Sequence, residues 1–497
     1  MTDPDHSRSK KNFLAAAALF ILALYFTRDG VFRPLWFDEA LTVMNFMALP
    51  GPVEIYHNYV IPNNHIVYTI LLKFWSYAYQ PFIAFDVYLR LLSLVITLTA
   101  FGIMFYRWKK HCGIWPAALV CACFAFALPF GIYSVAVRGY MLSFLLVVMA
   151  LEAARSWIAG PNWKSGTAYF IISLLAVGTI PSNIIALGAV VLCFAGFPLK
   201  NRKFITRFVF LAVIPLVALV LFYFPVSKGV ARVMALKEGW YNGFAAMTAL
   251  YLSWAVSFLP VIIAVIFAAP LVLKRKNSWQ KALIAVLILL LPAPFFLIIS
   301  PAPFPRVFFS VWPVWMYLLC CGLGHLFALA RLKKYRLAAK PLLPLALLAG
   351  AVFACGMAQQ EIKEYLSAKY VGQQGLDDFF YPYYMKDSFN PFDAVKSLQV
   401  QGAAEGTAKI YVSFNADPYS IIFYGKMLGI PAEVWSFDNP RGNVLSLENN
   451  CQRAILTGAG DENTFLGRFK GKAIEPVSAG NSFQRIYLIR NDDSAKP

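Results

Sequence analysis

The sequence predicts an α-helical polytopic membrane protein that ends in a small α/β domain. Of its 497 residues, 59% are hydrophobic and only 14% are charged, whereas a soluble domain carries about 25% charged residues. Apolar stretches near the ~20 residues that a transmembrane helix needs recur along residues 1–358. The pattern changes after residue 395, where short strand-like and helical segments are separated by turn residues.

About eleven membrane-spanning helices account for the apolar stretches. The first is short, and the alternative for it is a cleaved signal peptide. That alternative is disfavoured because Arg28-Asp29, and no small-residue cleavage site, follows the stretch. The predicted spans are residues 13–27, 88–106, 115–133, 139–157, 167–181, 183–199, 208–226, 245–273, 282–300, 307–329 and 341–358.

Basic residues between the spans predict the orientation, because cytoplasmic loops are enriched in Lys and Arg. Residues 1–360 hold 30 Lys and Arg against 9 Asp and Glu. Of these 30, 21 lie at the N-terminus and in alternate loops, and 9 lie on the opposite side. The N-terminus is therefore predicted to be cytoplasmic and the C-terminal region extracytoplasmic.

The net charge of +19 belongs to the membrane region, since residues 361–497 hold 14 Lys and Arg against 16 Asp and Glu. A nucleic-acid-binding domain would show a basic patch on a soluble surface. No nucleic-acid partner is expected. The charge fits cytoplasmic loops and contact with anionic membrane lipid.

Residues 28–87 form the predicted first outer loop, and its segment 65–80 is apolar enough to resemble a span. A span there would invert every later loop and place Arg107 to Lys110 outside. We therefore predict an interfacial or re-entrant helix on the outer side.

The region after the last span is predicted as a membrane-proximal connector (359–395) and an extracytoplasmic α/β domain (396–497). Only one of the eight cysteines, Cys451, lies in this domain, so no internal disulfide framework is expected. Predicted elements are strands over 409–413, 453–457 and 486–489, and a helix over 419–428 that ends at Gly429.

Two adjacent acids, Asp38 and Glu39, lie in the first outer loop in the sequence Trp36-Phe37-Asp38-Glu39-Ala40. The apolar pattern that follows predicts a short amphipathic helix with Asp38 as its N-cap. The helix dipole favours a carboxylate there, and such a carboxylate can accept a proton from an attacking hydroxyl or amine. The alternative is that Asp38 only caps the helix and Glu39 is solvated.

A second outer group comprises Asn64 and His65, which open the segment 65–80, together with Glu54 and His57. Histidine and carboxylate ligands suit several divalent metals. The candidate metal ligands are Glu54, His57 and His65, and the alternative is a structural role for the histidines.

Arg138 lies between two predicted spans, in the sequence Val137-Arg138-Gly139-Tyr140, and Arg306 has the same outer position later in the chain. A charge at such a place is costly and is usually paired or functional. Arginine binds phosphate in a bidentate manner. The alternative is an arginine that extends to the interface along its aliphatic stem.

The order of these motifs resembles that of the GT-C membrane glycosyltransferases. The order is a first span, an outer Asp-Glu pair, Asn-X-His, Arg-Leu-Leu-Ser at 90–93, Arg-Gly-Tyr-Met at 138–141 and Pro-Arg at 305–306. The nearest branch is the bacterial one related to protein O-mannosyltransferases and to the lipid A aminoarabinose transferase.

The resemblance implies an inverting transfer of a single sugar, outside the bacterial inner membrane, from a polyprenyl-phosphate-linked donor. The acceptor would be a glycan, lipid or protein of the cell envelope. The resemblance makes Asp38 the catalytic carboxylate and Glu39 the second acid, with His65 and Asn64 as further site residues. It places Arg138 and Arg306 near the donor phosphate, with Tyr140 beside Arg138.

The sequence departs from its relatives at two positions. His65-Ile66 replaces a frequent His-Pro, and Arg306-Val307 replaces a frequent Arg-Tyr. Both leave the branch and a divalent metal open. The competing functions are a transporter or flippase for a lipid-linked glycan, a non-catalytic membrane scaffold, and transfer of a whole oligosaccharide. Few charges lie within the spans and no internal repeat is present, which disfavours a transporter.

Overall fold

The chain divides into two compact units in the computed structural model. Unit 1 comprises Met1–Phe32 and Pro50–Tyr365, and unit 2 comprises Arg33–Leu49 and Leu366–Pro497. The structure describes residues 4–59, 65–126, 128–195, 202–229, 231, 287–288, 291, 305–330, 391–400, 408–412, 418–430, 432–437, 453–456, 473–477 and 485–490.

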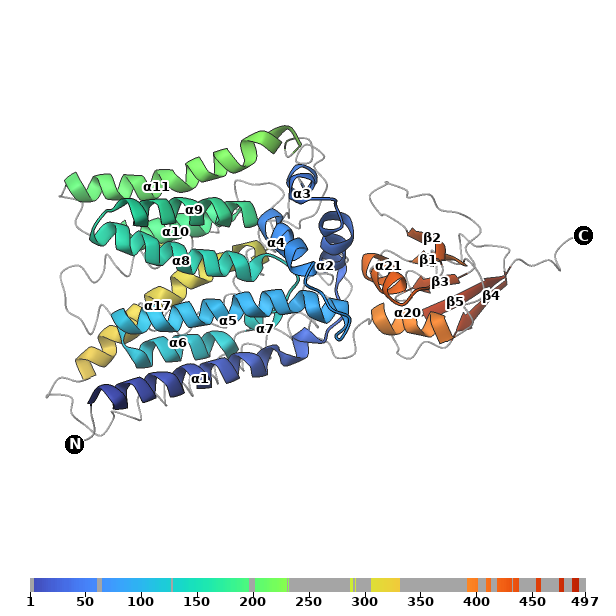
Figure 1. Cartoon of the computed structure of the whole chain (residues 1–497), viewed down its shortest axis with the longest axis horizontal. Coiled ribbons are helices and arrows are strands. Elements are labelled where there is room, and N and C mark those ends of the chain that lie inside the picture. The colour runs from blue at the N-terminus through green and yellow to red at the C-terminus, as the bar shows by residue number, and fades with distance from the viewer. Residues whose placement is uncertain are drawn as a thin grey trace, which may run out of the picture. The chain divides into compact units, whose positions relative to one another are not determined.

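Unit 1 is a bundle of helices that run side by side (Figure 1). Helix α8 contacts α5, α9, α10 and α17 and is buried around nearly its whole circumference, as expected of a helix that is apolar on all sides. The helices are α1 (Pro4–Val31), α5 (Phe85–Cys112), α6 (Ile114–Phe126), α7 (Leu128–Tyr133), α8 (Tyr140–Ala159), α9 (Trp163–Thr179), α10 (Asn183–Ala195), α11 (Arg202–Tyr223) and α17 (Trp312–Ala330), with the 3-10 helices η2 (Phe224–Val226) and η3 (Pro305–Val311).

The longer described helices of unit 1 overlap predicted membrane spans. Three are long and apolar enough to cross a membrane, namely Phe85–Cys112, Tyr140–Ala159 and Ile205–Gly229. Four further predicted spans match shorter apolar helices at Phe13–Arg28, Ile114–Ala125, Asn183–Phe194 and Phe308–Gly324. The predicted spans 245–273 and 341–358, and nearly all of 282–300, lie outside the described residues.

Two short helices, α3 (Pro52–Asn58) and α4 (Ile66–Ser76), lie at one end of the bundle (Figure 1). Helix α4 has 11 residues and is therefore about 16 Å long, too short to cross a ~30 Å hydrocarbon core. Its C-terminal end is fixed to α5, because the Trp75 indole N–H donates to the Tyr88 carbonyl (3.0 Å) and the Tyr88 hydroxyl donates to the Trp75 carbonyl (3.0 Å). Its length fits the predicted interfacial helix.

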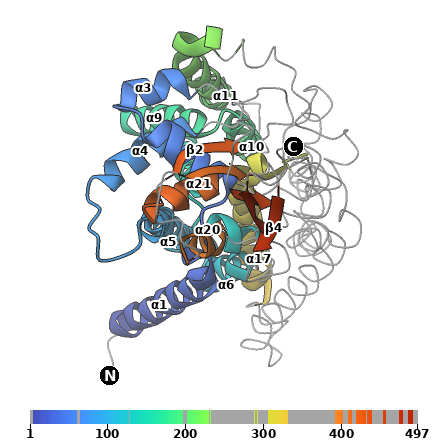
Figure 2. The same ribbon diagram turned by 90° about the vertical axis from the view of Figure 1, so that its right-hand side faces the viewer.

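Unit 2 contains a five-stranded sheet of order β2-β1-β3-β5-β4, with β2 and β4 at its edges (Figure 2). Strand β1 pairs in parallel with β2 and β3, and β5 pairs antiparallel with β3 and β4. Pro476 lies in β4, as suits an edge strand, because proline cannot donate to a ladder. The strands are β1 (Ala408–Val412), β2 (Ala432–Phe437), β3 (Arg453–Leu456), β4 (Ala473–Val477) and β5 (Arg485–Arg490).

Helices α20 (Pro391–Val400) and α21 (Pro418–Met427) of unit 2 pack against each other. The chain leaves α21 through Gly429, whose φ of 67° lies in the left-handed region that favours glycine. The Ile430 N–H then donates to the Gly425 carbonyl (2.9 Å). The predicted helix 419–428 overlaps α21, and the predicted strands overlap β1, β3 and β5.

Candidate active site

The acid pair lies on helix α2 (Phe37–Leu41), a single short turn that continues into a π-helix, η1 (Thr42–Met47). Asp38 is 7% exposed and Glu39 is fully buried. The N-cap is Trp36, so the prediction that Asp38 caps the helix is wrong. Glu39, the third residue of the helix, accepts the backbone N–H of this N-cap residue through its Oε2 at 3.2 Å. The alternative of a solvated Glu39 is wrong as well, because the side chain is buried.

Asp38 is the second residue of α2, so it lies in the first turn, where backbone amides and the helix dipole favour a negative charge. The Thr42 hydroxyl donates to the Asp38 carbonyl oxygen at 2.7 Å, which ties the end of α2 to the start of η1. Helix α2 thus carries two adjacent carboxylates. Glu39 accepts the backbone N–H of Trp36, and Asp38 lies next to it in the same turn.

Helix α2 packs within unit 2 against α21 of the C-terminal domain. The Leu35 backbone N–H donates to the buried Tyr424 hydroxyl at 2.7 Å. The Phe37 ring meets the Tyr419 ring edge-on, with centroids 5.0 Å apart. Sequence reasoning missed this pairing, because the partners lie 389 residues apart and neither aromatic residue forms a recognisable motif.

Arg138 lies in the loop between α7 and α8 of unit 1 and is 1% exposed. Its Nη1 donates to the buried Tyr59 hydroxyl at 3.1 Å. Tyr59 is the C-cap residue that follows α3. The guanidinium is therefore anchored in the protein, and it does not extend to solvent as the alternative prediction required.

The loop before Arg138 is held by three side chains of α5. The donors are Arg90 Nη1 to the Val135 carbonyl (3.1 Å), Ser93 Oγ to the Ala136 carbonyl (2.5 Å) and Thr97 Oγ1 to the Ser134 carbonyl (2.7 Å). Because positions i, i+3 and i+7 share one face of a helix, one side of α5 fixes three successive carbonyls. Sequence reasoning quoted Arg90 and Ser93 only as part of a motif and missed Thr97.

His65 joins this group in unit 1. Its Nδ1 accepts the Gly139 backbone N–H at 3.2 Å, which leaves the proton of a neutral ring on Nε2. The His65 ring lies edge-on to the Tyr140 ring at 5.0 Å, and both residues are buried. The structure therefore brings together three predicted site residues, His65, Arg138 and Tyr140, in one arginine cluster.

The other predicted residues are placed differently. Glu54 and His57 are exposed on α3, whereas His65 is buried. No three His, Cys, Asp or Glu side chains gather as a metal site within the described residues, so Glu54, His57 and His65 do not form one. Asn64 lies outside the described residues, and Arg306 lies on η3.

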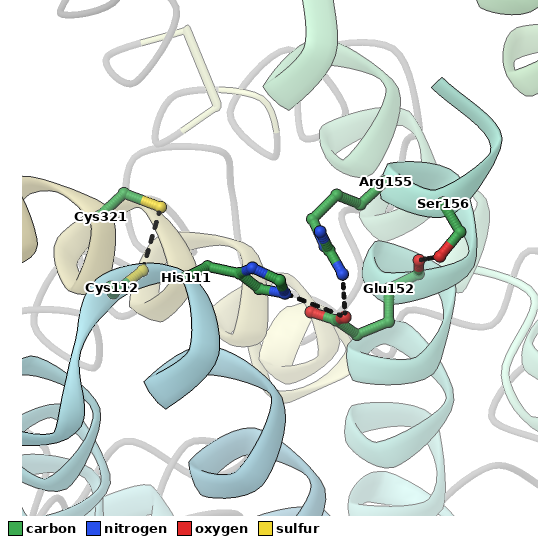
Figure 3. A network of polar contacts seen from close by, with 6 residues as sticks. All are labelled: His111, Cys112, Glu152, Arg155, Ser156 and Cys321. Atoms are coloured by element: carbon green, nitrogen blue, oxygen red, sulfur yellow. Dashed lines mark hydrogen bonds and ion pairs between the residues drawn. The ribbon is translucent and has the colours of Figure 1, made fainter. Parts of the chain in front are cut away.

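A separate polar cluster lies near the opposite end of α5 (Figure 3). The Arg155 Nη2 lies 3.2 Å and the His111 Nε2 3.9 Å from Glu152 Oε2. Cys112 and Cys321 lie with their sulfur atoms 3.6 Å apart. Arg90 and His111 are 21 residues apart on one helix, which is roughly 31 Å, so this cluster is not part of the arginine cluster.

No protein-family model and no curated protein sequence matches the chain. Among solved structures the chain is similar to ArnT from Cupriavidus metallidurans in the apo state, with a TM-score of 0.58, 14% identity, and coverage of 99% of this chain and 100% of that one. It is also similar to ArnT of the same organism bound to undecaprenyl phosphate, with a TM-score of 0.56, 14% identity, and coverage of 98% and 99%.

These likenesses extend over nearly the whole of both chains and establish the fold. The chain shares the helical fold of these two ArnT structures. The order of its sequence motifs predicted a helical membrane fold. The prediction of the fold class is thereby confirmed for the membrane region.

Proposed function

We propose that the chain is an inverting glycosyltransferase that moves a single sugar from a polyprenyl-phosphate-linked donor to a glycan, lipid or protein of the cell envelope. The observation that carries the proposal is the shared fold with ArnT, one structure of which is bound to undecaprenyl phosphate, over 98% of this chain. The proposed location is the bacterial inner membrane, with the N-terminus cytoplasmic and the domain 396–497 outside.

Asp38 is the proposed general base. It takes a proton from the acceptor hydroxyl or amine as the acceptor atom forms a bond to the anomeric carbon of the donor sugar. The bond between that carbon and the phosphate oxygen breaks, and the polyprenyl phosphate leaves with the electron pair. Attack from the face opposite the leaving group inverts the anomeric configuration.

Arg138 is the proposed ligand of the departing phosphate, and Tyr140 is proposed to contribute beside Arg138. Arg306 is the proposed second cation. A positive charge held in advance, where negative charge develops, lowers the barrier without reorganisation at the moment of reaction. The anchoring of Arg138 by Tyr59 supports this role, because it fixes the guanidinium before a donor binds.

Glu39 is a positioning residue in this proposal rather than a second base. Its carboxylate holds the Trp36 N–H and so fixes the first turn of α2, which carries Asp38. The proposal routes no step through a divalent metal, because the predicted ligands Glu54, His57 and His65 do not gather and His65 Nδ1 already accepts the Gly139 N–H.

The test of the activity is sugar transfer by the full chain in membranes, measured with a panel of polyprenyl-phosphate sugars and envelope acceptors. We expect one donor to lose its sugar to an acceptor fraction and to yield free polyprenyl phosphate. Failure of every donor would contradict the proposal. Movement of an intact lipid-linked glycan across the membrane would instead identify a transporter. The absence of both transfer and transport would favour a non-catalytic scaffold.

A further inference from the structure

A groove of about 410 Å³ lies between α1 and α5 of unit 1. Ligand pockets in proteins have volumes of about 300–1,000 Å³. Helix α1 contributes Phe13 and Phe20 to the groove, and α5 contributes Gly102, Phe105 and Lys109. Helix α1 lies at the periphery of unit 1 when the bundle is viewed end-on (Figure 2). The groove therefore lies at the edge of the described bundle, a surface that lipid would cover in a membrane protein.

The groove is lined mainly by apolar side chains, and Gly102 contributes no side chain to it. Phe13 is 72% exposed. A Cβ atom added at Gly102 would meet no atom within 4 Å, so the missing side chain leaves space unfilled at this point. Gly102, Phe105 and Lys109 lie at positions i, i+3 and i+7 and so share one face of α5. A chain lying in the groove would run along this face.

Lys109 lines the groove at the C-terminal turn of α5, and Lys110 follows it in the sequence and lies over the lining residue Tyr106. Lys109 Nζ lies 5.3 Å from the Phe105 ring centroid, and Lys110 Nζ lies 4.2 Å from the Tyr106 ring centroid. Lysines extend along apolar surface in this way while their ammonium groups stay at the membrane interface. None of the described residues that line the groove is acidic. The described lining of the groove therefore carries only positive charge at this end.

The dimensions fit one leaflet of a bilayer. Gly102 and Lys109 are separated by seven residues, or about 10 Å along the helix. One leaflet contributes about 15 Å, half of a ~30 Å hydrocarbon core, so this part of the groove lies within a single leaflet. The end with the lysines is the end that the sequence predicts to be cytoplasmic. The cytoplasmic leaflet carries the anionic lipids that attract basic residues near the membrane.

We propose that this groove binds one anionic phospholipid of the cytoplasmic leaflet. An acyl chain lies along Gly102 and Phe105, and the phosphate accepts hydrogen bonds from the ammonium groups of Lys109 and Lys110. The charge complementarity selects an anionic lipid over a neutral one and over an apolar protein helix. The proposal concerns a site on the predicted cytoplasmic side and does not depend on the proposed transferase activity.

Native mass spectrometry of the full chain in detergent tests the proposal. Phosphatidylglycerol and phosphatidylcholine with the same acyl chains are added in a titration, and the bound lipid is counted. We expect the wild type to hold one phosphatidylglycerol in preference to phosphatidylcholine. Gly102→Leu fills the groove and should weaken binding of both lipids, whereas Gly102→Ala, with its single methyl group, should leave binding near the wild type.

The head-group contacts are tested by Lys109→Gln and Lys110→Gln. Each should lower the preference for phosphatidylglycerol by about fivefold, since one basic residue near an anionic surface contributes about that factor. Lys164→Gln is the matched control, because Lys164 is an exposed lysine on the same predicted side of the membrane and lies outside the groove. Equal lipid binding by the wild type and Gly102→Leu would overturn the proposal, as would equal effects of Lys109→Gln and Lys164→Gln.

Discussion

At the scale of single residues, Gly139 is the position where the arginine cluster leaves no room. A Cβ atom there would lie 2.9 Å from His65 Nδ1, 2.6 Å from Thr179 Cγ2 and 3.1 Å from Tyr68 Cβ. His65 accepts the N–H of this same residue. The absence of a side chain at position 139 therefore lets the histidine approach the start of α8.

We predict that Gly139→Ala destabilises the protein by about 1–3 kcal/mol, the usual cost of overpacking a buried site. Transfer activity should fall as well, because the methyl group displaces His65 from the start of α8. Thermal unfolding in detergent measures the first effect. Gly102→Ala is the control, since its added methyl meets no atom within 4 Å. Equal melting temperatures for the two variants would contradict the prediction.

Tyr424 is the single residue that best tests the contact between the acid helix and the C-terminal domain. Tyr424→Phe removes the acceptor of the Leu35 N–H, and a buried donor left without its partner costs roughly 1–3 kcal/mol. We expect faster proteolysis of the segment before α2 and lower transfer activity. Tyr77→Phe, at a tyrosine that is 66% exposed, should change neither. Unchanged proteolysis in Tyr424→Phe would argue against the contact.

At the scale of elements, α5 orders the loop that carries Arg138. We predict that Ser93→Ala lowers the free energy of unfolding by roughly 1–3 kcal/mol, because it leaves the Ala136 carbonyl and the Tyr68 hydroxyl buried without this partner. Chemical denaturation measures the change. Thr99→Ala on the same helix is the control, since Thr99 is exposed and donates to the Val95 carbonyl of its own helix. Equal losses in the two variants would contradict the prediction.

Particular elements show how far the sequence can predict this protein. The exit of α21 through Gly429 was predictable because a left-handed residue after a helix favours glycine. The N-cap of α2 was predicted wrongly, because aspartate is a common capping residue. In the structure the N-cap is Trp36, and Glu39 accepts its backbone N–H. Helix α2 also packs on α21, a contact that local propensity does not predict.

In the candidate site, too, some features could be predicted from the local sequence and others could not. Arg138 was predictable because a charge between two membrane spans is costly. His65 was predictable because histidine is a common ligand-type side chain and opens the segment 65–80. The contacts of His65 with Gly139 and Tyr140 were not, since they join the start of α4 to the start of α8, and His65 and Gly139 are 74 residues apart. Contacts of this length depend on the tertiary fold and carry no local pattern.

At the scale of the whole molecule, the basic loops predict that Asp38, Arg138 and the C-terminal domain lie outside the cytoplasm. A reporter enzyme that is active only outside the cytoplasm should therefore be active when fused after Pro497. The same reporter fused after Lys110 should be inactive, because the loop from Arg107 to Lys110 is predicted to be cytoplasmic. Activity after Lys110 and none after Pro497 would show that the orientation is opposite to the predicted one. Asp38 would then lie on the cytoplasmic side, which contradicts the proposal.

The central claim is that Asp38 is the general base of a glycosyltransferase, and transfer by Asp38→Asn tests it most directly. The donor identified with the wild type is used, with Asp393→Asn as the control, since Asp393 is an exposed acid of the same unit. We expect Asp38→Asn to be folded and inserted but slower by about 10²–10⁴-fold, the usual contribution of a general base, and Asp393→Asn to match the wild type. Transfer at the wild-type rate by Asp38→Asn would contradict the claim.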